Sequence, residues 1–401
     1  MTSDQSVLII GGGIGGLSAA LALRQVGVRA QVFEQAEALK EVGAGVSLWP
    51  NAMRALAQLG LAEPVMADHQ RLERIVIRRS DGAHLLRLDQ PGRYPEPAIC
   101  VHRAHLQGVL ADALATDRLH LGRRLVSFRD HQDRVDAEFH DGTDVSGSLL
   151  IGCDGIRSTT RARLHSQAPP RYRGYQIWRG VSPLQLPPEL MHQSTEWWGV
   201  GRRFGILPGE PGHVFWYATQ SVDGGPEFRE GAARPAHKSA HDTLSERRRS
   251  GETPGSFKQW PFPVPELLAA PYQGDPILTD AEDRPVPRSW GRGLVTLLGD
   301  AAHPMTPNMG QGACTAIEDA VVLARCIAAS GVTPAALRRF ERLRQPRTRR
   351  IVRQSNRIGR LGQLNRPALA AMRDSVIRLT PPPLLGPPQR RVYGYRAPEI
   401  R

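Results

Sequence analysis

A glycine-rich turn near the start of the chain restricts its fold more than any other feature. The apolar run Val7–Ile10 predicts a buried strand, Gly11-Gly-Gly-Ile-Gly-Gly16 follows at once, and Leu17–Gln25 predicts a helix. Arg29–Phe33 then predicts a second strand that ends at Glu34. A strand, a G-x-G-x-x-G turn, a helix and a strand ending in an acid form the βαβ fingerprint of adenine-dinucleotide binding.

Each residue of this fingerprint has a physical role. Gly11 permits a tight turn, Gly13 lets the backbone approach a pyrophosphate, and Gly16 lets the helix pack closely on the strand. Glu34 stands where an acid can hold both hydroxyls of a ribose. A 2′-phosphate would be repelled by this carboxylate, so the site favours NAD or FAD over NADP.

A second segment, near residue 300, has the pattern of a ligand-binding loop. Leu294–Leu298 predicts a buried strand, and a Pro/Gly-rich loop leads from Asp300 to a helix that begins near Gly312. The Asp300 carboxylate can accept hydrogen bonds from a polyol, and Gly310 and Gly312 let the backbone reach a flat ligand. A helix N-terminus attracts partial negative charge. This combination suits a flavin, although an ordinary α/β connection has the same order of elements.

Two further segments carry candidate phosphate contacts. Gly152–Arg161 is glycine-rich and follows a predicted three-strand meander whose third strand is Val145–Ile151. Its Asp154 and arginines can form a structural pair or contact a second phosphate. Arg103, at the start of a predicted helix, can clamp a phosphate or pair with a carboxylate, and the sequence favours neither.

Residues 169 to 290 have a different character, because large aromatic side chains recur on strand-like segments. They predict an antiparallel sheet with one face in the core and the other lining a pocket for a flat substrate. The segment 221–257 is polar and predicts an excursion from this sheet. The aromatic residues concerned are Trp178, Trp197, Trp198, Phe204, Phe215, Trp216 and Tyr217.

Composition excludes several classes of protein. The four cysteines are scattered and indicate reduced thiols in a cytoplasmic protein, not a disulfide framework or a metal site. No apolar stretch is long enough to span a membrane. The net charge of +13 comes almost wholly from arginine. The basic run 338–360 predicts a solvated helical face more than a nucleic-acid footprint, because no nucleic-acid-binding module accompanies it.

Three motifs in this order resemble those of the single-component, FAD-dependent aromatic hydroxylases, the superfamily of para-hydroxybenzoate and salicylate hydroxylases. They are GGGIGG with its later Glu34, CDGIRSTTR at 153–161, and LLGDAAHPMTPNMGQGACTAIEDA at 297–320. GAGVSLWPNAMRAL and RYRGYQIWRG are most similar to the subgroup of urate hydroxylase and zeaxanthin epoxidase. The resemblance runs from residue 7 to about residue 360.

The resemblance implies specific contacts to a non-covalent FAD. The glycine turn would hold the pyrophosphate, Glu34 the ribose, and Asp300 the ribityl chain or the pyrophosphate. Arg103 would reach the pyrophosphate, Leu125 the adenine, and Val46 and Ser47 the side toward which the flavin swings. The full implied set is Gly11, Gly13, Gly15, Gly16, Glu34, Val46, Ser47, Arg103, Leu125, Asp154, Gly155, Asp300, Pro307, Gly310, Gln311, Gly312 and Ala313.

The resemblance also implies a reaction. NADH or NADPH would reduce the flavin, O2 would add to it, and a C4a-hydroperoxide would hydroxylate an aromatic or polyunsaturated small molecule. Arg203 aligns with the arginine given a catalytic role in urate hydroxylase, and Arg202 is its rival on the opposite strand face. Phe215 stands where urate hydroxylase has a tyrosine, which puts urate itself in doubt. The predicted substrate-binding residues are Trp178, Arg203, Phe215 and Trp216.

Other functions on this scaffold explain less of the sequence. An epoxidase shares the motifs, a halogenase would need a WxWxIP segment, and a plain NAD dehydrogenase would leave the Asp300 loop unused. A non-catalytic FAD-binding protein differs only in lacking substrate-stimulated NAD(P)H oxidation. We expect a monomer or homodimer that binds no nucleic acid and no metal.

The predicted fold class is α/β: a Rossmann-like FAD-binding domain with an inserted, mainly antiparallel substrate domain and a C-terminal helix. The FAD-binding domain is predicted in three parts, at 1–70, 96–168 and 291–330. Substrate-domain segments are predicted at 71–95 and 169–290, and a helical region with an irregular tail at 331–401.

Overall fold

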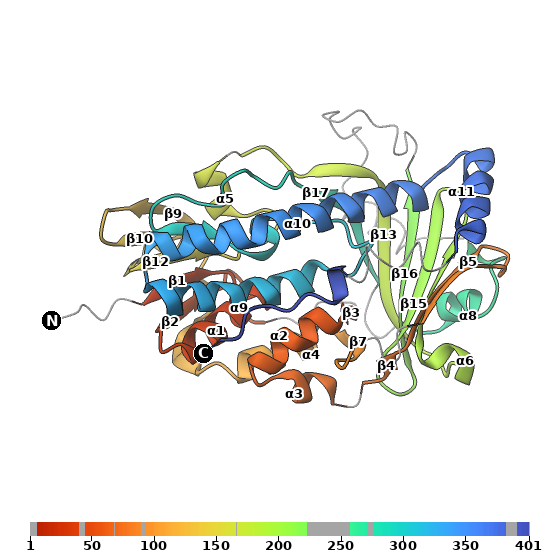
Figure 1. Cartoon of the computed structure of the whole chain (residues 1–401), viewed down its shortest axis with the longest axis horizontal. Coiled ribbons are helices and arrows are strands. Elements are labelled where there is room, and N and C mark those ends of the chain that lie inside the picture. Colours follow the sequence, from red (N-terminus) through yellow and green to blue (C-terminus); the bar gives the residue numbers. More distant parts are fainter. Residues whose placement is uncertain are drawn as a thin grey trace.

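The computed structural model describes residues 6–39, 45–67, 69–89, 94–165, 167–222, 257–271, 276–381 and 391–400. A parallel sheet flanked by helices forms one body, and a large, mainly antiparallel sheet stands beside it (Figure 1). Most of the predicted excursion at 221–257 lies outside the described residues. So do residues 40–44, which include the first two of the motif GAGVSLWPNAMRAL.

The parallel sheet has five strands, and its central strand, β1, is completely buried. Strands covered on both faces are expected to be continuous apolar runs, as Val7–Ile10 is. β1 pairs in parallel with β2 and with β12, whose other neighbour is β18. In spatial order the strands are β18 (Val295–Leu297), β12 (Leu149–Gly152), β1 (Val7–Ile10), β2 (Ala30–Phe33) and β8 (Leu119–His120).

The predicted third strand of the meander, Val145–Ile151, is wrong as a single strand. Its first part is β11 (Asp144–Gly147), which pairs with β10, and its second part is β12, which enters the parallel sheet. A Cβ on Gly147 would lie 2.5 Å from the Leu8 side chain, so the chain can cross from one sheet to the other only with glycine there.

The large sheet has seven strands and two differently covered faces. Helices α6 (Pro188–Met191) and α8 (Val264–Ala269) cover one face, and the other faces the parallel-sheet body. All neighbouring strands are antiparallel except β14 and β5. In order they are β17 (Ile277–Asp283), β13 (Arg171–Pro183), β16 (His213–Ser221), β15 (Arg202–Pro208), β14 (Gln193–Trp198), β5 (Arg74–Arg79) and β6 (His84–Asp89).

Two three-stranded sheets complete the strand content of the described chain. One is β3 (Gly45–Leu48), β7 (Ala98–His102) and β4 (Arg71–Leu72), and the other is β11, β10 (Val135–Phe139) and β9 (Leu125–Asp130). The remaining elements are α1 (Ile14–Gln25), α2 (Pro50–Gln58), α3 (Ala62–Met66), α4 (Arg103–Asp112), η1 (Thr116–Arg118), α5 (Thr159–Leu164), η3 (Gly299–Ala301), α9 (Gly312–Ser330), α10 (Pro334–Gly362) and α11 (Pro367–Leu379).

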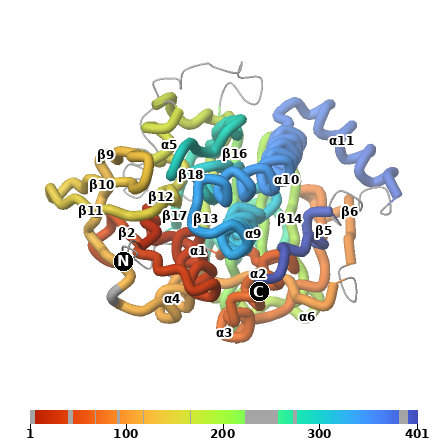
Figure 2. The backbone as a smooth tube through the Cα atoms, turned by 60° about the vertical axis from the view of Figure 1, so that its left-hand side comes forward, coloured from red at the N-terminus to blue at the C-terminus, as the bar shows by residue number. Residues whose placement is uncertain are grey.

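The C-terminal elements connect the two bodies. α9 packs against α1, and α10 runs along α9 from the parallel sheet toward the large sheet (Figure 1). α11 then lies at the far end of the large sheet, while residues 391–400 return to the side of α2 (Figure 2). After the predicted FAD-binding segments have ended, the chain therefore crosses to the large sheet and lies again on the parallel-sheet body.

Candidate active site

The glycine turn between β1 and α1 is closed by protein on one side and open on the other. Gly11 has φ of +109°, and a Cβ on Gly16 would lie 1.9 Å from the Gly11 carbonyl oxygen. Glycine at 16 is thus required for α1 to pack on the turn. A Cβ on Gly13, in contrast, would meet no atom within 4 Å. No side chain caps α1, so its first amides are available to an anion beside Gly13.

Two side chains flank this turn. Glu34, at the end of β2, accepts hydrogen bonds from the amides of Gly12 at 2.6 Å and Ala36 at 2.9 Å. From α4, Gln107 Nε2 donates to the Gly12 carbonyl at 2.8 Å. Gln107 is missing from the residues predicted from sequence, although a residue four positions after Arg103 shares its helix face. The structure therefore adds Gln107 to the candidate site.

Asp300 lies in η3, between β18 and the loop that leads to α9. Its side chain is accessible on one side. Partial removal from water raises the pKa of this carboxyl above its ordinary value, and the nearby His303 and Arg103 offset only part of that rise. A Cβ on Gly312 would lie 3.9 Å from Asp300 Oδ1, so the carboxylate and the uncapped N-terminus of α9 open on the same space. The structure thus places Asp300 beside Gly312, with Arg103 close enough to lower the pKa of Asp300.

Residues 303–311, which we call the ring loop, pack directly on β3. Gly310 has φ of +58°, and a Cβ there would lie 2.9 Å from Trp49 Nε1 and 3.3 Å from Ser47 Cβ. Gln311 Oε1 accepts from Asn51 Nδ2 at 3.0 Å, whereas Gln311 Nε2 is buried without a partner. Buried donors normally have partners, so this amide fits a polar ligand beside the loop. The other predicted residues here are partly or fully accessible: Val46, Pro307, Gly312 and Ala313.

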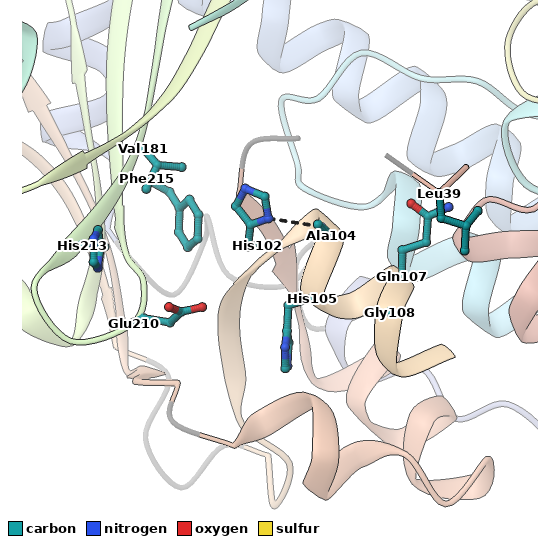
Figure 3. A pocket seen from close by; sticks show the side chains of 10 residues that line it. All are labelled: Leu39, His102, Ala104, His105, Gln107, Gly108, Val181, Glu210, His213 and Phe215. Atoms are coloured by element: carbon teal, nitrogen blue, oxygen red, sulfur yellow. Dashed lines mark hydrogen bonds between the residues drawn. The ribbon is translucent and has the colours of Figure 1, made fainter. Parts of the chain in front are cut away.

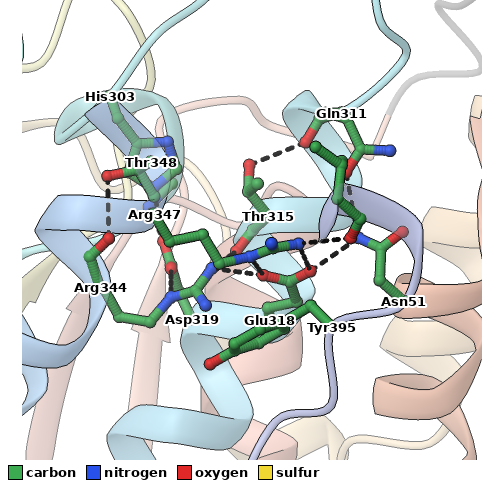
Figure 4. A network of polar contacts seen from close by, with 12 residues as sticks. Asn51, His303, Gln311, Thr315, Glu318, Asp319, Arg344, Arg347, Thr348 and Tyr395 are labelled. Carbon is green, nitrogen blue, oxygen red and sulfur yellow. Dashed lines mark hydrogen bonds and ion pairs between the residues drawn. The ribbon is translucent and has the colours of Figure 1, made fainter. Parts of the chain in front are cut away.

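A buried ionic network holds the ring loop against α9 and α10 (Figure 4). His303 Nε2 lies 2.6 Å from Asp319 Oδ2, and Arg344 Nε donates to Asp319 Oδ1 at 2.6 Å. Arg344 Nη2 and Arg347 Nη2 each donate to Glu318, also at 2.6 Å. Except for Arg347, which is slightly exposed, these side chains are fully buried. Part of the predicted solvated face of α10 is therefore an internal support of the site.

Replacing Arg344 by glutamine is expected to destabilise the protein by about 3–5 kcal/mol, because Glu318 and Asp319 would lose a buried partner. Urea unfolding measures this loss, and Arg342→Gln is the control, since Arg342 is exposed on the same helix. Equal stability of the two variants would show that the network contributes little.

The network also predicts the direction of a pH effect. Burial raises the pKa of Asp319, but His303 and Arg344 outweigh it and hold the pKa below the ordinary 3.8. The carboxylate then contributes stability that is present above pH 3.8 and is lost as the pH falls through the lower folded value. The difference between the wild type and Arg344→Gln should therefore shrink as unfolding is measured at increasingly acidic pH.

The Asp-Gly motif shapes the loop before α5. Asp154 accepts hydrogen bonds from Ser158 Oγ at 2.5 Å and from Thr160 N and Oγ1 at 2.9 and 3.1 Å. Burial raises the pKa of this carboxyl. Gly155 has φ of +78°, and a Cβ there would meet no atom within 4 Å. Asp154 thus orders the loop, and the backbone of Gly155 is accessible. Leu125, the predicted neighbour of the adenine, is buried at the start of β9.

The arginines of this loop have structural partners. Arg161 Nη1 donates to the carbonyls of Ala301 and Ala302 at 3.1 and 3.2 Å, so it supports the turn that carries Asp300. Arg157 pairs with Glu282 at 3.0 Å. Asp154 is therefore not bonded to either arginine: its partners are Ser158 and Thr160.

Arg203, on β15, is a buried cation beside the ring loop. Its Nη1 donates to Glu196 Oε1 at 3.0 Å, and its Nη2 donates to Asn308 Oδ1 at 2.6 Å. Asn308 Nδ2 in turn donates to the Tyr175 hydroxyl at 3.1 Å. Burial opposes the charge, but Glu196 raises the pKa of Arg203 above its usual value. A permanent positive charge is therefore bonded to the residue that follows Pro307.

Strand alternation sorts the predicted substrate residues onto two faces. Arg203 and Phe215 share the face toward the ring loop and β3, where a Cβ on Gly45 would lie 2.5 Å from Phe215. Trp178 and Trp216 lie on the opposite face, in the hydrophobic cluster that includes α8. Arg203 and Phe215 thus share a sheet face, four strand positions apart, and Trp178 and Trp216 lie on the other face.

A cavity of about 450 Å³ opens between α4 and the large sheet (Figure 3). Gln107 and His102 line one side, and Phe215, His213 and Glu210 line the other. Since Gln107 also contacts the glycine turn, the cavity extends from near that turn to the aromatic wall of the large sheet. Its volume is in the range that holds drug-sized ligands.

The residues present fit a flavin adenine dinucleotide. Two uncapped helix N-termini, an open glycine backbone at Gly13, an accessible carboxylate at Asp300 and an unpartnered amide at Gln311 surround one region. These are the groups that a pyrophosphate, a ribityl chain and a polar ring edge require.

Comparison with known proteins identifies the family. The family described as "FAD binding domain" matches residues 4–243 and 279–355, and the aurachin C monooxygenase/isomerase of Stigmatella aurantiaca is 39% identical over 383 residues. The latter match covers 94% of this chain and 95% of that protein. The chain belongs to the FAD-dependent aromatic hydroxylases. The predicted family and α/β fold class are therefore confirmed, and the chain is an FAD-dependent monooxygenase.

Two other members of the family are informative about the site. The 2-heptyl-3-hydroxy-4(1H)-quinolone synthase of Pseudomonas aeruginosa is 33% identical over 380 residues, covering 94% of each chain. The crystal structure of Klebsiella pneumoniae HpxO with FAD and uric acid superposes with a TM-score of 0.84 at 28% identity, covering 98% of each chain.

Two further properties concern the described residues. No helix among them is both long and apolar enough to cross a bilayer. No group of three or more His, Cys, Asp or Glu side chains in these parts of the chain is placed to hold a metal ion.

Proposed function

We propose that this hydroxylase inserts one atom of O2 into an electron-rich aromatic or heteroaromatic ring at the expense of NADH or NADPH. The substrate C–H bond becomes C–OH, the nicotinamide loses a hydride, and the second oxygen atom leaves as water with that hydride and a proton. The proposal is supported by the buried Arg203, which stands beside the ring loop on the face that carries Phe215. Hydroxylation is preferred to epoxidation because the relatives' names describe monooxygenases and hydroxylases.

In this proposal the predicted residues hold FAD between the glycine turn after β1 and the ring loop. The amides beside Gly13 and the side chain of Arg103 bind the pyrophosphate, and Glu34 binds the ribose hydroxyls in exchange for its bond to Gly12. Gln107 positions the turn from the other side. Asp300 accepts hydrogen bonds from the ribityl chain or lies beside the pyrophosphate.

The ring loop and β3 would hold the flavin ring. The backbone from Gly310 to Ala313 and the N-terminus of α9 would hold the ring edge, where they favour negative charge. Val46 and Ser47 would bound the opposite side of the ring, and Pro307 would lie toward the substrate. When bound, FAD supplies the acceptance of a hydride and the activation of O2. The protein would position the ring, exclude water from it and supply charge beside it.

Arg203 is the proposed catalytic residue. Its guanidinium is held by Glu196 and Asn308, so it need not reorganise when negative charge develops on a hydroxylated ring. Phe215 lies on the same sheet face, four positions along β16 from Thr219, which pairs with Arg203. Arg202 lies on the opposite strand face and is not needed in this arrangement.

We further propose a fused, nitrogen-containing ring as the substrate. HpxO was crystallised with uric acid, and the Pseudomonas relative is named for a hydroxylated 4-quinolone with a heptyl chain. Phe215 gives this chain an apolar wall, and the cavity of about 450 Å³ has room for a ring with a substituent. Phe215, in place of the tyrosine of urate hydroxylase, offers no hydroxyl to a polar ring, which favours a quinolone-like ring over urate.

The test is substrate-stimulated NAD(P)H oxidation by the FAD-loaded protein. We expect the purified protein to be yellow, and a 4-quinolone or 4-hydroxyquinoline to raise NADH or NADPH oxidation at least about tenfold, with ¹⁸O from ¹⁸O2 in the product. Uric acid and 4-hydroxybenzoate are the comparison substrates. A yellow protein that no aromatic compound stimulates would favour the non-catalytic FAD-binding alternative.

A further inference from the structure

α11 carries an exposed apolar stripe that the fold does not use. Its inner face is fixed, because Arg373 lies 5.2 Å from the ring centroid of Trp198 and donates to the Gly199 carbonyl. On the outer face Met372, Val376 and Leu379 are 60%, 57% and 79% exposed. Their spacing of four and three residues places them on one side of the helix. Figure 2 shows α11 projecting from the end of the molecule.

A stripe of arginines on α10 leads to this helix. Arg349, Arg353, Arg357 and Arg360 recur at helical spacing and line one groove of about 600 Å³. The groove contains eight arginines, and its one carboxylate, Asp283, is already bonded to Arg173 and Asn356. Arg360 is followed by Leu361, which is 45% exposed. Exposed positive charge and exposed aliphatic side chains are thus contiguous along the chain from α10 to α11.

Acidic side chains within this stretch of the sequence do not balance its charge. Between residues 353 and 380 the sequence has six arginines and one acid, Asp374, which pairs with Arg373 at 2.8 Å. An aliphatic stripe flanked by arginine is the pattern of a helix that lies in the interface of an anionic bilayer, with its apolar side chains among the acyl chains.

We propose that α11 and the arginine stripe of α10 form a docking surface for an anionic lipid membrane. Charge complementarity selects this partner over a second copy of the chain, because two such surfaces would bring arginines against arginines. It is also favoured over a nucleic acid, because exposed aliphatic side chains add nothing to phosphate binding. The docking is peripheral, since the α11 stripe is short and its inner face stays packed on the large sheet.

The experiment is sedimentation of the FAD-loaded full chain with vesicles. We expect binding to vesicles of phosphatidylcholine with phosphatidylglycerol, little binding to pure phosphatidylcholine, and release by added salt. Met372→Ser with Val376→Ser and Leu379→Ser should weaken the partition coefficient at least about tenfold. The matched control places serine at three exposed apolar positions elsewhere, Leu121, Val332 and Leu343, and should bind as the wild type does.

A charge variant tests the second half of the surface. Arg357→Ser with Arg360→Ser should bind at least about fivefold more weakly, whereas Arg124→Ser with Arg129→Ser should not. Light scattering and binding to a labelled oligonucleotide separate the other occupants. A dimer that the α11 variant dissociates, oligonucleotide binding without vesicle binding, or equal binding by all variants would each overturn the proposal.

Discussion

Replacing Gly13 by valine is expected to give a folded protein that no longer retains FAD. A Cβ at this position meets no protein atom within 4 Å, and the backbone has φ of −75°, which any residue adopts. The valine side chain would instead occupy the space in which we place the pyrophosphate. We expect FAD affinity to fall at least about 100-fold, or about 2.7 kcal/mol, measured by titration of the apoprotein with FAD.

The contrast is with Gly16, three residues further along the same turn. A Cβ there would lie 1.9 Å from the Gly11 carbonyl oxygen, so Gly16→Ala should lower the melting temperature of the apoprotein itself. Gly13→Val should leave that temperature unchanged. If Gly13→Val stays fully yellow after dialysis, the pyrophosphate does not bind at this turn, and the assignment of Glu34 fails with it.

Replacing Arg203 by glutamine is expected to preserve FAD binding but to divert reducing equivalents from product to H2O2. The guanidinium is a buried positive charge bonded to Asn308 of the ring loop, and glutamine cannot stabilise an anionic ring in its place. Product formation should fall at least about tenfold, which corresponds to about 1.4 kcal/mol of transition-state stabilisation. The measurement is the ratio of hydroxylated product to NAD(P)H consumed, with H2O2 assayed in parallel.

Loss of Arg203 has a structural consequence that must be separated from the catalytic one. Glu196 would be left without its partner in a largely buried site, which destabilises a protein by up to about 3–5 kcal/mol. Arg203→Gln combined with Glu196→Gln removes both charges and should recover part of this stability without recovering the coupling ratio. Recovery of normal coupling in the double variant would show that Arg203 acts only through folding.

The sequence shows more of the site around Gly13 than of the site around Arg203. The roles of Gly11, Gly13 and Gly16 follow from local chain geometry, because a turn between a strand and a helix needs glycine wherever a Cβ has no room or a ligand must approach. The same holds for Asp300 and Gly312, which are only twelve residues apart and are joined by a loop and a helix start. The turn and the loop before α9 have the local geometry that the sequence predicts, and their contacts to FAD stay predictions.

The environment of Arg203 was not predictable. Its partners Glu196 and Asn308 come from a neighbouring strand and from a loop 105 positions away. Alternation showed that Arg202 and Arg203 point to opposite faces, but not which face the parallel-sheet body covers. The same ambiguity explains why Trp178 and Trp216 were grouped with Phe215, although they pack against α8 behind the sheet.

The C-terminal tail shows this limit most clearly. Tyr393 stacks on Trp49 with ring centroids 4.5 Å apart, and Arg54 Nη1 donates to the Tyr395 carbonyl at 2.6 Å. Trp49 is the residue against which Gly310 of the ring loop packs. No spacing in an irregular, proline-rich tail indicates that it supports the ring loop from more than 300 residues beyond Trp49.

The sequence by itself determined the glycine turn, the acid at residue 300, the aromatic sheet and the α/β class, because each depends on backbone conformation or on periodicity within a short segment. Only the tertiary structure decided which sheet face meets the ring loop, how Glu318 and Asp319 are neutralised by Arg344 and Arg347, and where the tail returns. These outcomes depend on which surfaces bury the most apolar area together and on which buried charges find partners. Both are properties of the whole packed chain.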